Sequence, residues 1–402
     1  MVAYTFYEGD NRVRRYAETL VKDGVDVDAI VLRKPGQKPH EIIRGVHVYR
    51  IQTRIKNEKN RLTYLKRLLT FFFLSAWVLS LRHLRARYDI IHVHSVPDFQ
   101  VFATLIPRLM GARVILDIHD IVPELYASKF KVSHRSVLFR LLVLVERLSV
   151  IYSDHVIVAN HLWHERLARR SGRPERCSTI LNYPDPTIFH WRPRTVAPDN
   201  SFVLCYPGTL SSHQGVDLVI SAMAQLRNKA PNLKFVILGD GAERERLEAM
   251  ASEHGLGNRI TIQASVSVEK VAEIMANVDL GVDPKLKRSF ANEALSTKIL
   301  EFMAMGVPVL ASDTRVHQLY FKDGLIQFFE SENVDDLAAK ILELMHDSAK
   351  CNSFRARGMS FVEQNNWEVK KNEYLDLVDR LVKRPLNQPA PCSEAKKTSR
   401  QL

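Results

Sequence analysis

Two glutamates and a lysine form the clearest candidate for chemistry in this sequence. Glu293 and Glu301 are eight residues apart, and Lys298 lies between them in the segment SFANEALSTKILEFMAMGVPVLAS. Apolar residues at helical spacing predict a helix over 297–305, which a glycine and then a proline end. Backbone N–H groups near a helix N-terminus attract phosphate, and a carboxylate deeper in the helix can accept hydrogen bonds from the two hydroxyls of a ribose. The segment therefore indicates a sugar-nucleotide site, although a bare pair of glutamates also fits a solvated helix face.

The text of this segment resembles a known family motif. Lys298 to Val309 matches, almost residue for residue, the Glu-x7-Glu motif of the retaining family-4 glycosyltransferases, which have the two-domain GT-B fold. The resemblance implies a retaining transferase that moves a hexose from a nucleoside-diphosphate sugar, such as a UDP- or GDP-sugar, to an acceptor hydroxyl. It also implies roles: Glu301 would hold the ribose, Glu293 would orient the sugar, and Lys298 would stabilise the leaving diphosphate.

Glycines at two other strand ends add candidates for donor binding. The text PGTLSSHQGVD follows an expected strand at 202–207, and a glycine there permits close approach of the backbone to a pyrophosphate. Many relatives have Lys-Gly where this chain has Gln214-Gly215, so a protonated His213 or Lys298 becomes the cationic candidate. The text LGDG at 238–241 is similar to the family's strand-end Gly-x-Gly, which leaves room for the nucleotide; a plain tight turn is the alternative. The donor-binding candidates are Gly208, Thr209, His213, Gly215, Gly239, Gly241, Lys298 and Glu301.

The first half of the chain offers histidines at the ends of two expected strands, 90–94 and 114–118. His119 resembles the family's first-domain histidine that contacts the donor sugar near the reacting carbon, which makes it the third catalytic candidate beside Glu293 and Lys298. A histidine with satisfied hydrogen bonds at a strand end is the alternative. Ligand spacings for zinc are absent, and the family mostly works without bound metal, so no metal or other cofactor is expected. Candidates on the acceptor side are Asp10, Arg12, Arg15, His94, Asp120 and Glu124.

Strand and helix patterns must position these residues, and they alternate twice along the chain. Such alternation predicts an α/β protein with parallel sheets. With the resemblance, we expect the GT-B fold: two Rossmann-like domains facing a central cleft, where ligands bind at the carboxyl ends of the strands. The expected divisions are an acceptor-side domain at 1–185, a proline-rich linker at 186–201, a donor domain at 202–365, a helix crossing back to the first domain at 366–384 and a disordered tail at 385–402.

The positive charge of the chain is concentrated in its first half. The net charge is +12, and residues 1–200 hold 32 Lys and Arg against 19 Asp and Glu. This asymmetry predicts an anionic partner, either a membrane surface or a lipid-phosphate acceptor. Nucleic acid is not expected, because no nucleic-acid-binding motif is recognisable.

An apolar stretch at 68–81 lies inside this basic zone. Fourteen residues are too few to span a bilayer, so we do not expect a transmembrane segment. The stretch fits a buried helix, or a helix in the membrane interface whose end residues Lys66, Arg67, Arg82 and Arg85 contact headgroups.

The cysteines and the N-terminal residues indicate where in the cell the protein is expected. Four widely separated cysteines indicate a reduced environment, and no secretory signal is recognisable. We therefore expect a cytoplasmic protein, peripheral on the inner face of the cell membrane. The chain begins inside an expected strand, so its natural start is expected a few residues upstream.

Other classes of protein with the GT-B fold require other functional residues. A sugar-nucleotide 2-epimerase needs paired acid–base carboxylates, and a phosphorylase needs a lysine that holds pyridoxal phosphate; neither pattern is recognisable. A nonenzymatic nucleotide-sugar-binding or scaffold protein is the remaining alternative. Retention of Glu293, Glu301 and His119 argues against it.

Overall fold

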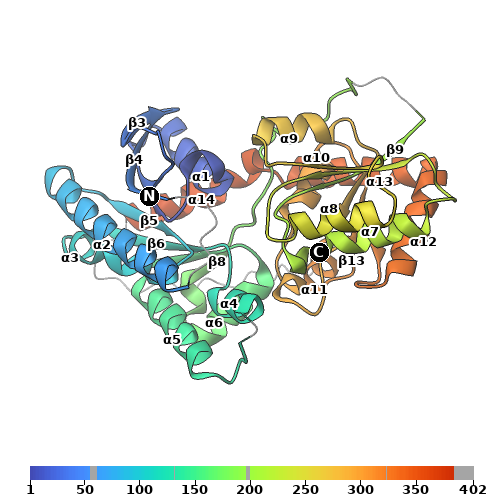
Figure 1. The fold of residues 1–402 in the computed structure, drawn as a ribbon. Coiled ribbons are helices and arrows are strands. Elements are labelled where there is room, and N and C mark those ends of the chain that lie inside the picture. Colours follow the sequence, from blue (N-terminus) through green and yellow to red (C-terminus); the bar gives the residue numbers. More distant parts are fainter. Residues whose placement is uncertain (55–60, 131, 196–199, 323, 384–402) are drawn as a thin grey trace. The chain divides into compact units, whose positions relative to one another are not determined.

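The computed structural model describes residues 1–402 except 55–60, 131, 196–199, 323 and 384–402. The chain folds into two compact units, one made of Met1–Asn182 with Lys371–Leu402 and the other of Tyr183–Lys370 (Figure 1). The predicted tail at 385–402 and part of the predicted linker lie outside the described residues.

Unit 1 is built on an eight-stranded sheet in the order β3-β4-β2-β1-β5-β6-β7-β8. Only β3 is antiparallel to its neighbour; the other pairings are parallel. The central strands are almost continuously apolar because helices cover both faces of a parallel sheet. The strands are β1 (Val2–Ala3), β2 (Asp28–Arg33), β3 (His40–Ile43), β4 (Val46–Thr53), β5 (Ile90–His94), β6 (Arg113–Ile118), β7 (His155–Val158) and β8 (Cys177–Thr179).

The helices of unit 1 connect these strands. The last of them follows the second unit in sequence, and from Lys371 onward it belongs to unit 1. The helices are η1 (Tyr7–Gly9), α1 (Asn11–Lys22), α2 (Arg61–Arg85), η2 (Asp98–Thr104), α3 (Leu105–Leu109), α4 (Val122–Phe130), α5 (Val137–Tyr152), α6 (His161–Ser171), η3 (Pro174–Arg176) and α14 (Trp367–Val382), where η denotes a 3-10 helix.

Unit 2 is built on a six-stranded, wholly parallel sheet in the order β11-β10-β9-β12-β13-β14. Two apolar clusters pack on it, one that includes Phe235 and one that includes Phe302. The strands are β9 (Phe202–Pro207), β10 (Leu233–Leu238), β11 (Ile260–Gln263), β12 (Leu280–Asp283), β13 (Val309–Ser312) and β14 (Gln327–Phe329). The helices are η4 (Ser212–Gln214), α7 (Val216–Gln225), α8 (Arg244–Glu253), α9 (Val268–Met275), η5 (Phe290–Asn292), α10 (Thr297–Ala304), α11 (Arg315–Tyr320), α12 (Val334–His346) and α13 (Ser348–Gln364).

The two parallel-sheet units confirm the predicted α/β class, and one difference lies at the edge of the first sheet. Strand β3 is mostly exposed and pairs with β4 through a turn in which Arg44 and Gly45 both have positive φ. A short polar edge strand leaves little pattern in a sequence, so β3 was not predicted. Helix α2 has 25 residues, more than the apolar stretch within it suggested.

Candidate active site

A buried ion pair forms the centre of the site in unit 2. Asp283 is the last residue of β12, and its Oδ1 accepts a hydrogen bond from Lys298 Nζ at 3.0 Å. Asp283 is fully buried and Lys298 is 9% exposed. Lys298 Nζ also lies 4.7 Å from the centre of the Tyr206 ring, where the negative face of the ring attracts a cation.

Both members of this pair carry charge at neutral pH. Burial by itself lowers the pKa of Lys298, but the carboxylate of Asp283 outweighs it and raises the pKa above its usual value. Burial by itself raises the pKa of Asp283, but the positive charge of Lys298 outweighs burial and lowers that pKa below its usual value. On the other side of the carboxylate, His317 Nε2 lies 3.2 Å from Asp283 Oδ2. Lys298 is therefore a cation held in one place by the strand end.

The glycine loop after β9 lies directly against this lysine. A Cβ atom placed on Gly208 would lie 3.3 Å from Lys298 Cε. Farther along, Gly215 has φ +67, and a Cβ there would lie 2.0 Å from the carbonyl oxygen of Pro284. Only glycine fits this junction, because the loop before α7 is packed on the end of β12. Thr209 is exposed in the same loop.

The predicted Gly-x-Gly at 239–241 is shaped by a neighbouring loop. A Cβ on Gly239 would lie 1.9 Å from the carbonyl oxygen of Gly208, and one on Gly241 would lie 2.0 Å from that of Leu210. These glycines are thus required by contact between two strand-end loops, whereas the sequence alone suggested room for a nucleotide. The contact fixes the shape of the loop that the nucleotide is expected to meet.

His213 is neutral in the ligand-free protein. Burial, helped by the positive charges of Lys285 and Lys298, lowers the pKa of His213 to about 4. Its ring packs edge-on against Phe290, with 5.0 Å between the centroids. Of the two cations proposed for this loop from the sequence, only Lys298 is charged near pH 7.

The two glutamates of the motif take different places. Glu293 follows η5, and its Oε1 accepts a hydrogen bond from Arg315 Nη1 at 3.0 Å. Glu301 lies in α10, one turn after Lys298, is partly exposed, and its charge adds to the rise in the pKa of Lys298. Within unit 2, the structure therefore places Lys298 against the glycine loop at the carboxyl ends of the central strands β9 and β12, with Glu301 one helical turn after Lys298.

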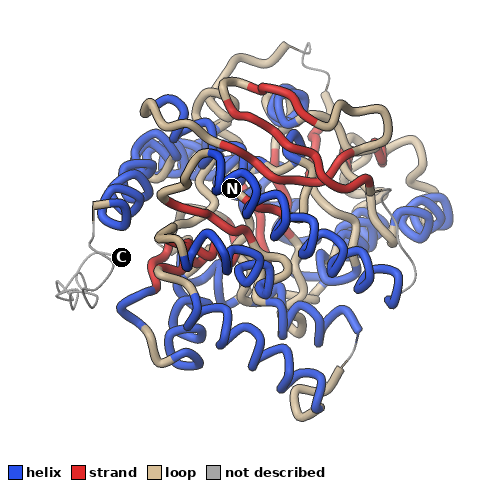
Figure 2. Tube along the Cα trace, turned by 90° about the vertical axis from the view of Figure 1, so that its left-hand side faces the viewer, coloured by secondary structure: helices blue, strands red, loops and turns tan. Residues whose placement is uncertain are grey.

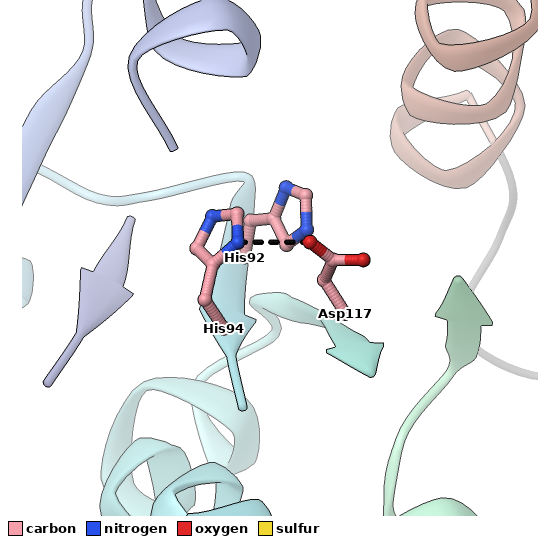
Figure 3. A group of neighbouring side chains, drawn as sticks. All are labelled: His92, His94 and Asp117. Carbon is pink, nitrogen blue, oxygen red and sulfur yellow. Dashed lines mark hydrogen bonds and ion pairs between the residues drawn. The ribbon is translucent and has the colours of Figure 1, made fainter. Parts of the chain in front are cut away.

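In unit 1 a buried polar cluster lies at the ends of β5 and β6. His94 Nδ1 lies 3.0 Å from Asp117 Oδ2, as drawn in Figure 3. Arg12 donates to both oxygens of Asp117, each at 2.7 Å. His92 Nδ1 lies 3.0 Å from the hydroxyl of Tyr374, so α14 joins the same cluster. All these side chains are buried.

Charges in this cluster follow from burial and from Arg12. Burial raises the pKa of Asp117, but Arg12 outweighs it and holds the pKa well below its usual range. Burial lowers the pKa of His94, even though Asp117 acts in the opposite direction. A neutral His94 donates from Nδ1 to Asp117, which leaves Nε2 as an acceptor; that atom has no hydrogen-bond partner among the described residues.

His92, His94 and Asp117 offer ligand atoms within 4.8 Å of one another. Both oxygens of Asp117 already accept hydrogen bonds from Arg12, whose positive charge would repel a metal cation. The residues present therefore suit an internal charge network better than a metal ion.

Three of the remaining acceptor-side candidates, Asp10, Arg15 and Glu124, have hydrogen-bond partners inside unit 1. Asp10 caps the N-terminus of α1, and Arg15 donates to the side-chain oxygen of Asn182. Glu124 accepts hydrogen bonds from Arg170, which also binds the buried Glu146. The side chains of Arg12, Asp10 and Glu124 thus have partners inside unit 1, so the structure adds nothing that points to their contact with an acceptor.

His119 lies directly beyond β6, and both it and the following Asp120 are partly exposed. The Nδ1 atom of His119 is buried and has no hydrogen-bond partner among the residues that the structure describes. Asp98, which the sequence did not suggest, is buried nearby and accepts a hydrogen bond from Ser95 Oγ at 2.8 Å. Burial raises the pKa of Asp98 to about 6, while the hydrogen bond from Ser95 acts to lower it.

Sequence reasoning assigned no role to Asp283 and Asp117. Each stands at or near the end of a buried strand and follows apolar residues. A buried carboxylate needs a cation beside it. An aspartate at the end of a buried strand was therefore a signal in the sequence for a charged partner.

Two units, each built on a largely parallel sheet with charged side chains at its strand ends, define a two-domain α/β protein. Sequence comparison narrows the class. The profile described as "Glycosyl transferases group 1" matches residues 188–361, and that described as "Glycosyl transferase 4-like domain" matches residues 9–182. The chain belongs to the group 1 glycosyltransferases and is therefore an enzyme of that kind.

Individual relatives are distant. The chain is 26% identical over 286 residues to alpha-D-kanosaminyltransferase of Streptomyces kanamyceticus, covering 66% of this chain and 72% of the relative. It is 26% identical over 240 residues to a phosphatidylinositol N-acetylglucosaminyltransferase subunit from Arabidopsis thaliana, covering 58% of this chain but only 48% of that protein.

Solved structures agree on the fold. Sucrose-phosphate synthase from Thermosynechococcus elongatus has a TM-score of 0.76 at 20% identity, covering 94% of this chain and 98% of that one. Anabaena HepE in complex with UDP and glucose has a TM-score of 0.70 at 16% identity, with coverage of 94% and 98%. The predicted GT-B fold is confirmed.

Proposed function

We propose that this enzyme transfers a hexose from a UDP- or GDP-sugar, with retention of configuration, to a hydroxyl of a glycan or lipid-linked acceptor in cell-surface polysaccharide synthesis. The buried Lys298–Asp283 pair against the glycine loop carries the proposal. Lys298 of this pair supplies a positive charge held in place beside a backbone that can approach a diphosphate closely. The UDP and glucose bound by the structural neighbour HepE support a nucleotide-sugar donor.

The proposed mechanism uses position and charge. Negative charge develops on the diphosphate as the bond to the sugar breaks, and preorganised cations and amides stabilise such charge strongly. Lys298 and the amides of residues 208–215 would do this here. By the family resemblance, Glu301 holds the ribose, Glu293 orients the sugar and His119 contacts a sugar hydroxyl. The leaving phosphate would then accept the proton of the acceptor hydroxyl on the same face.

Nucleotide binding tests the donor site directly. We expect UDP or GDP, among a panel with ADP and CMP, to raise the melting temperature of the protein. A ligand that binds only the folded state stabilises it by mass action. Glu301→Ala should weaken that nucleotide about 10-fold or more, because it removes a charged hydrogen-bond acceptor. Glu248→Ala, an exposed glutamate on α8, is the matched control and should bind as the wild type does.

The same titration can contradict the proposal. A folded protein that binds none of these nucleotides or their sugars would overturn the donor site. Equal binding by the wild type and Glu301→Ala would overturn the assignment of Glu301.

Metal removal provides a second test. We propose that Lys298 supplies the positive charge that a divalent cation supplies in other diphosphate sites, so transfer should continue in excess EDTA at near the full rate. Sugar transfer to acceptor is measured with and without the chelator, followed by adding back Mg²⁺ or Mn²⁺. Loss of activity that either cation restores would contradict this expectation.

A further inference from the structure

Unit 1 exposes an unusual amount of apolar surface on three of its helices. Fifteen of the twenty-one exposed large apolar side chains among the described residues belong to α2, α3 and α5. We define the apolar face by the most exposed of them on each helix: Phe73, Trp77 and Leu84 of α2, Leu109 of α3, and Val137 and Leu141 of α5. Phe73 and Trp77 are each 66% exposed, and Leu109 is 79% exposed.

The three helices form one continuous region of unit 1. Segment η2 joins them: Phe99 packs on Phe72 of α2 with 5.9 Å between ring centroids, and Phe102 packs on Tyr152 of α5 at 5.1 Å. Helix α3 continues directly from η2. Figure 2 is turned so that the side with α2, α3 and α5 in Figure 1 faces the viewer, and helices run across this side of the unit.

Helix α2 is apolar on two faces, of which only one is covered. Phe71, Ser75 and Leu79 recur at helical spacing and are buried in unit 1. Phe73 and Trp77 occupy the other face and are open to solvent. Soluble monomers rarely expose large contiguous apolar patches without a binding role.

By length and composition, Thr63–Arg85 is the one helix among the described residues that would be able to cross a membrane. Because the helix is longer than the apolar stretch within it, length alone does not exclude a membrane span. Packing decides the question instead, because Phe71 and Leu79 are already buried against the protein. While unit 1 stays folded, that face of α2 stays packed on η2, so α2 meets a membrane only with its opposite face.

The exposed charged side chains on the three helices of the apolar face are positive. Lys66, Arg85, Arg140 and Arg147 are exposed on the same helices. Helices α2 and α3 contain no acidic residue, and the only one in α5, Glu146, is buried against Arg170. A second copy of this chain would place two positively charged rims against each other, which is unfavourable. An anionic bilayer complements both the charge and the apolar surface.

We propose that the apolar face of α2, α3 and α5 inserts into the interface of an anionic membrane, such as the cytoplasmic leaflet, and holds the enzyme there. Charge in the first half of the chain predicts only electrostatic attraction to an anionic surface. The proposal adds that named apolar side chains enter the membrane and provide the binding. It is independent of the donor site and would place unit 1 at the surface where a lipid-linked acceptor is found.

Vesicle binding of the full chain tests the proposal without any nucleotide. The wild type should float with phosphatidylcholine vesicles that contain phosphatidylglycerol, and bind vesicles of phosphatidylcholine alone far more weakly. Phe73→Ser with Trp77→Ser should reduce binding about 100-fold, because two large apolar groups no longer leave water. Both side chains are exposed, so the melting temperature should not fall.

The controls separate this proposal from its rivals. Trp191→Ser removes an equally bulky tryptophan, 56% exposed in unit 2, and should bind vesicles as the wild type does. Binding should persist in part at high salt, which screens charge but not apolar contact. Unchanged binding by the double variant, binding abolished by salt alone, or a dimer in light scattering that the double variant dissociates would each overturn the proposal.

Discussion

Lys298→Met is expected to lower kcat/KM for sugar transfer by about 100-fold or more, with most of the loss in kcat. The methionine retains the shape of the side chain but removes the charge that would meet the leaving diphosphate. The variant also leaves Asp283 buried without its cation, a change that costs about 3–5 kcal/mol of stability. Activity must therefore be measured below the melting temperature of the variant.

A second substitution separates catalysis from structure. Asp283→Asn combined with Lys298→Met removes both charges and should recover most of the lost stability, because replacing a whole buried pair is nearly neutral. If Lys298 stabilises the diphosphate, the double variant recovers its melting temperature and stays inactive. Recovery of both stability and activity would show that Lys298 acts only by keeping unit 2 folded.

Asp117→Ala is expected to have the largest effect on the stability of unit 1. It leaves the guanidinium of Arg12, which is 4% exposed, without its bidentate partner and deprives His94 of its acceptor. Removing one partner of a buried pair costs about 3–5 kcal/mol. For a unit of this size the melting temperature should fall by about 6–20 °C. Differential scanning calorimetry measures the shift.

The pH dependence of this effect has a definite sign. The pKa of Asp117 is lowered in the folded protein, mainly because the charge of Arg12 outweighs burial. Its stabilisation is therefore fully present above the unfolded pKa of about 3.9 and is lost as the pH falls through the folded pKa. The difference between wild type and Asp117→Asn should be constant from mildly acidic to neutral pH. A difference that disappears near neutral pH would show that Asp117 is not the charged partner of Arg12.

A surface pair provides the matched control. Glu248 accepts a hydrogen bond from Arg244 at 2.9 Å on the exposed side of α8. Exposed pairs contribute about 0–1 kcal/mol, so Glu248→Gln should leave the melting temperature almost unchanged. An equally large fall in both variants would mean that burial does not decide the value of these pairs.

The amino-acid sequence alone determined the helices and strands whose formation depends on residues close to one another along the chain. Apolar spacing, followed by glycine and proline, placed α10 within one residue of its observed Thr297–Ala304. The helix predicted at 366–384 contains the observed α14, Trp367–Val382. Alternation of strands and helices predicted both parallel sheets. These features come from hydrogen bonding and burial within a few turns or strands, so they leave a pattern in the text.

Tertiary structure alone decided which charges meet. Asp283 and Lys298 are 15 residues apart, and Arg12 and Asp117 are 105 apart. No local pattern links such partners, because sheet order and burial bring them together. The same holds for α2, whose apolar residues look alike in the sequence. Only packing shows that Phe71 is buried while Trp77 is open to solvent. The sequence determined which residues are able to do chemistry, and the fold decided which of them are paired, neutral or exposed, because those properties depend on surroundings that distant segments supply.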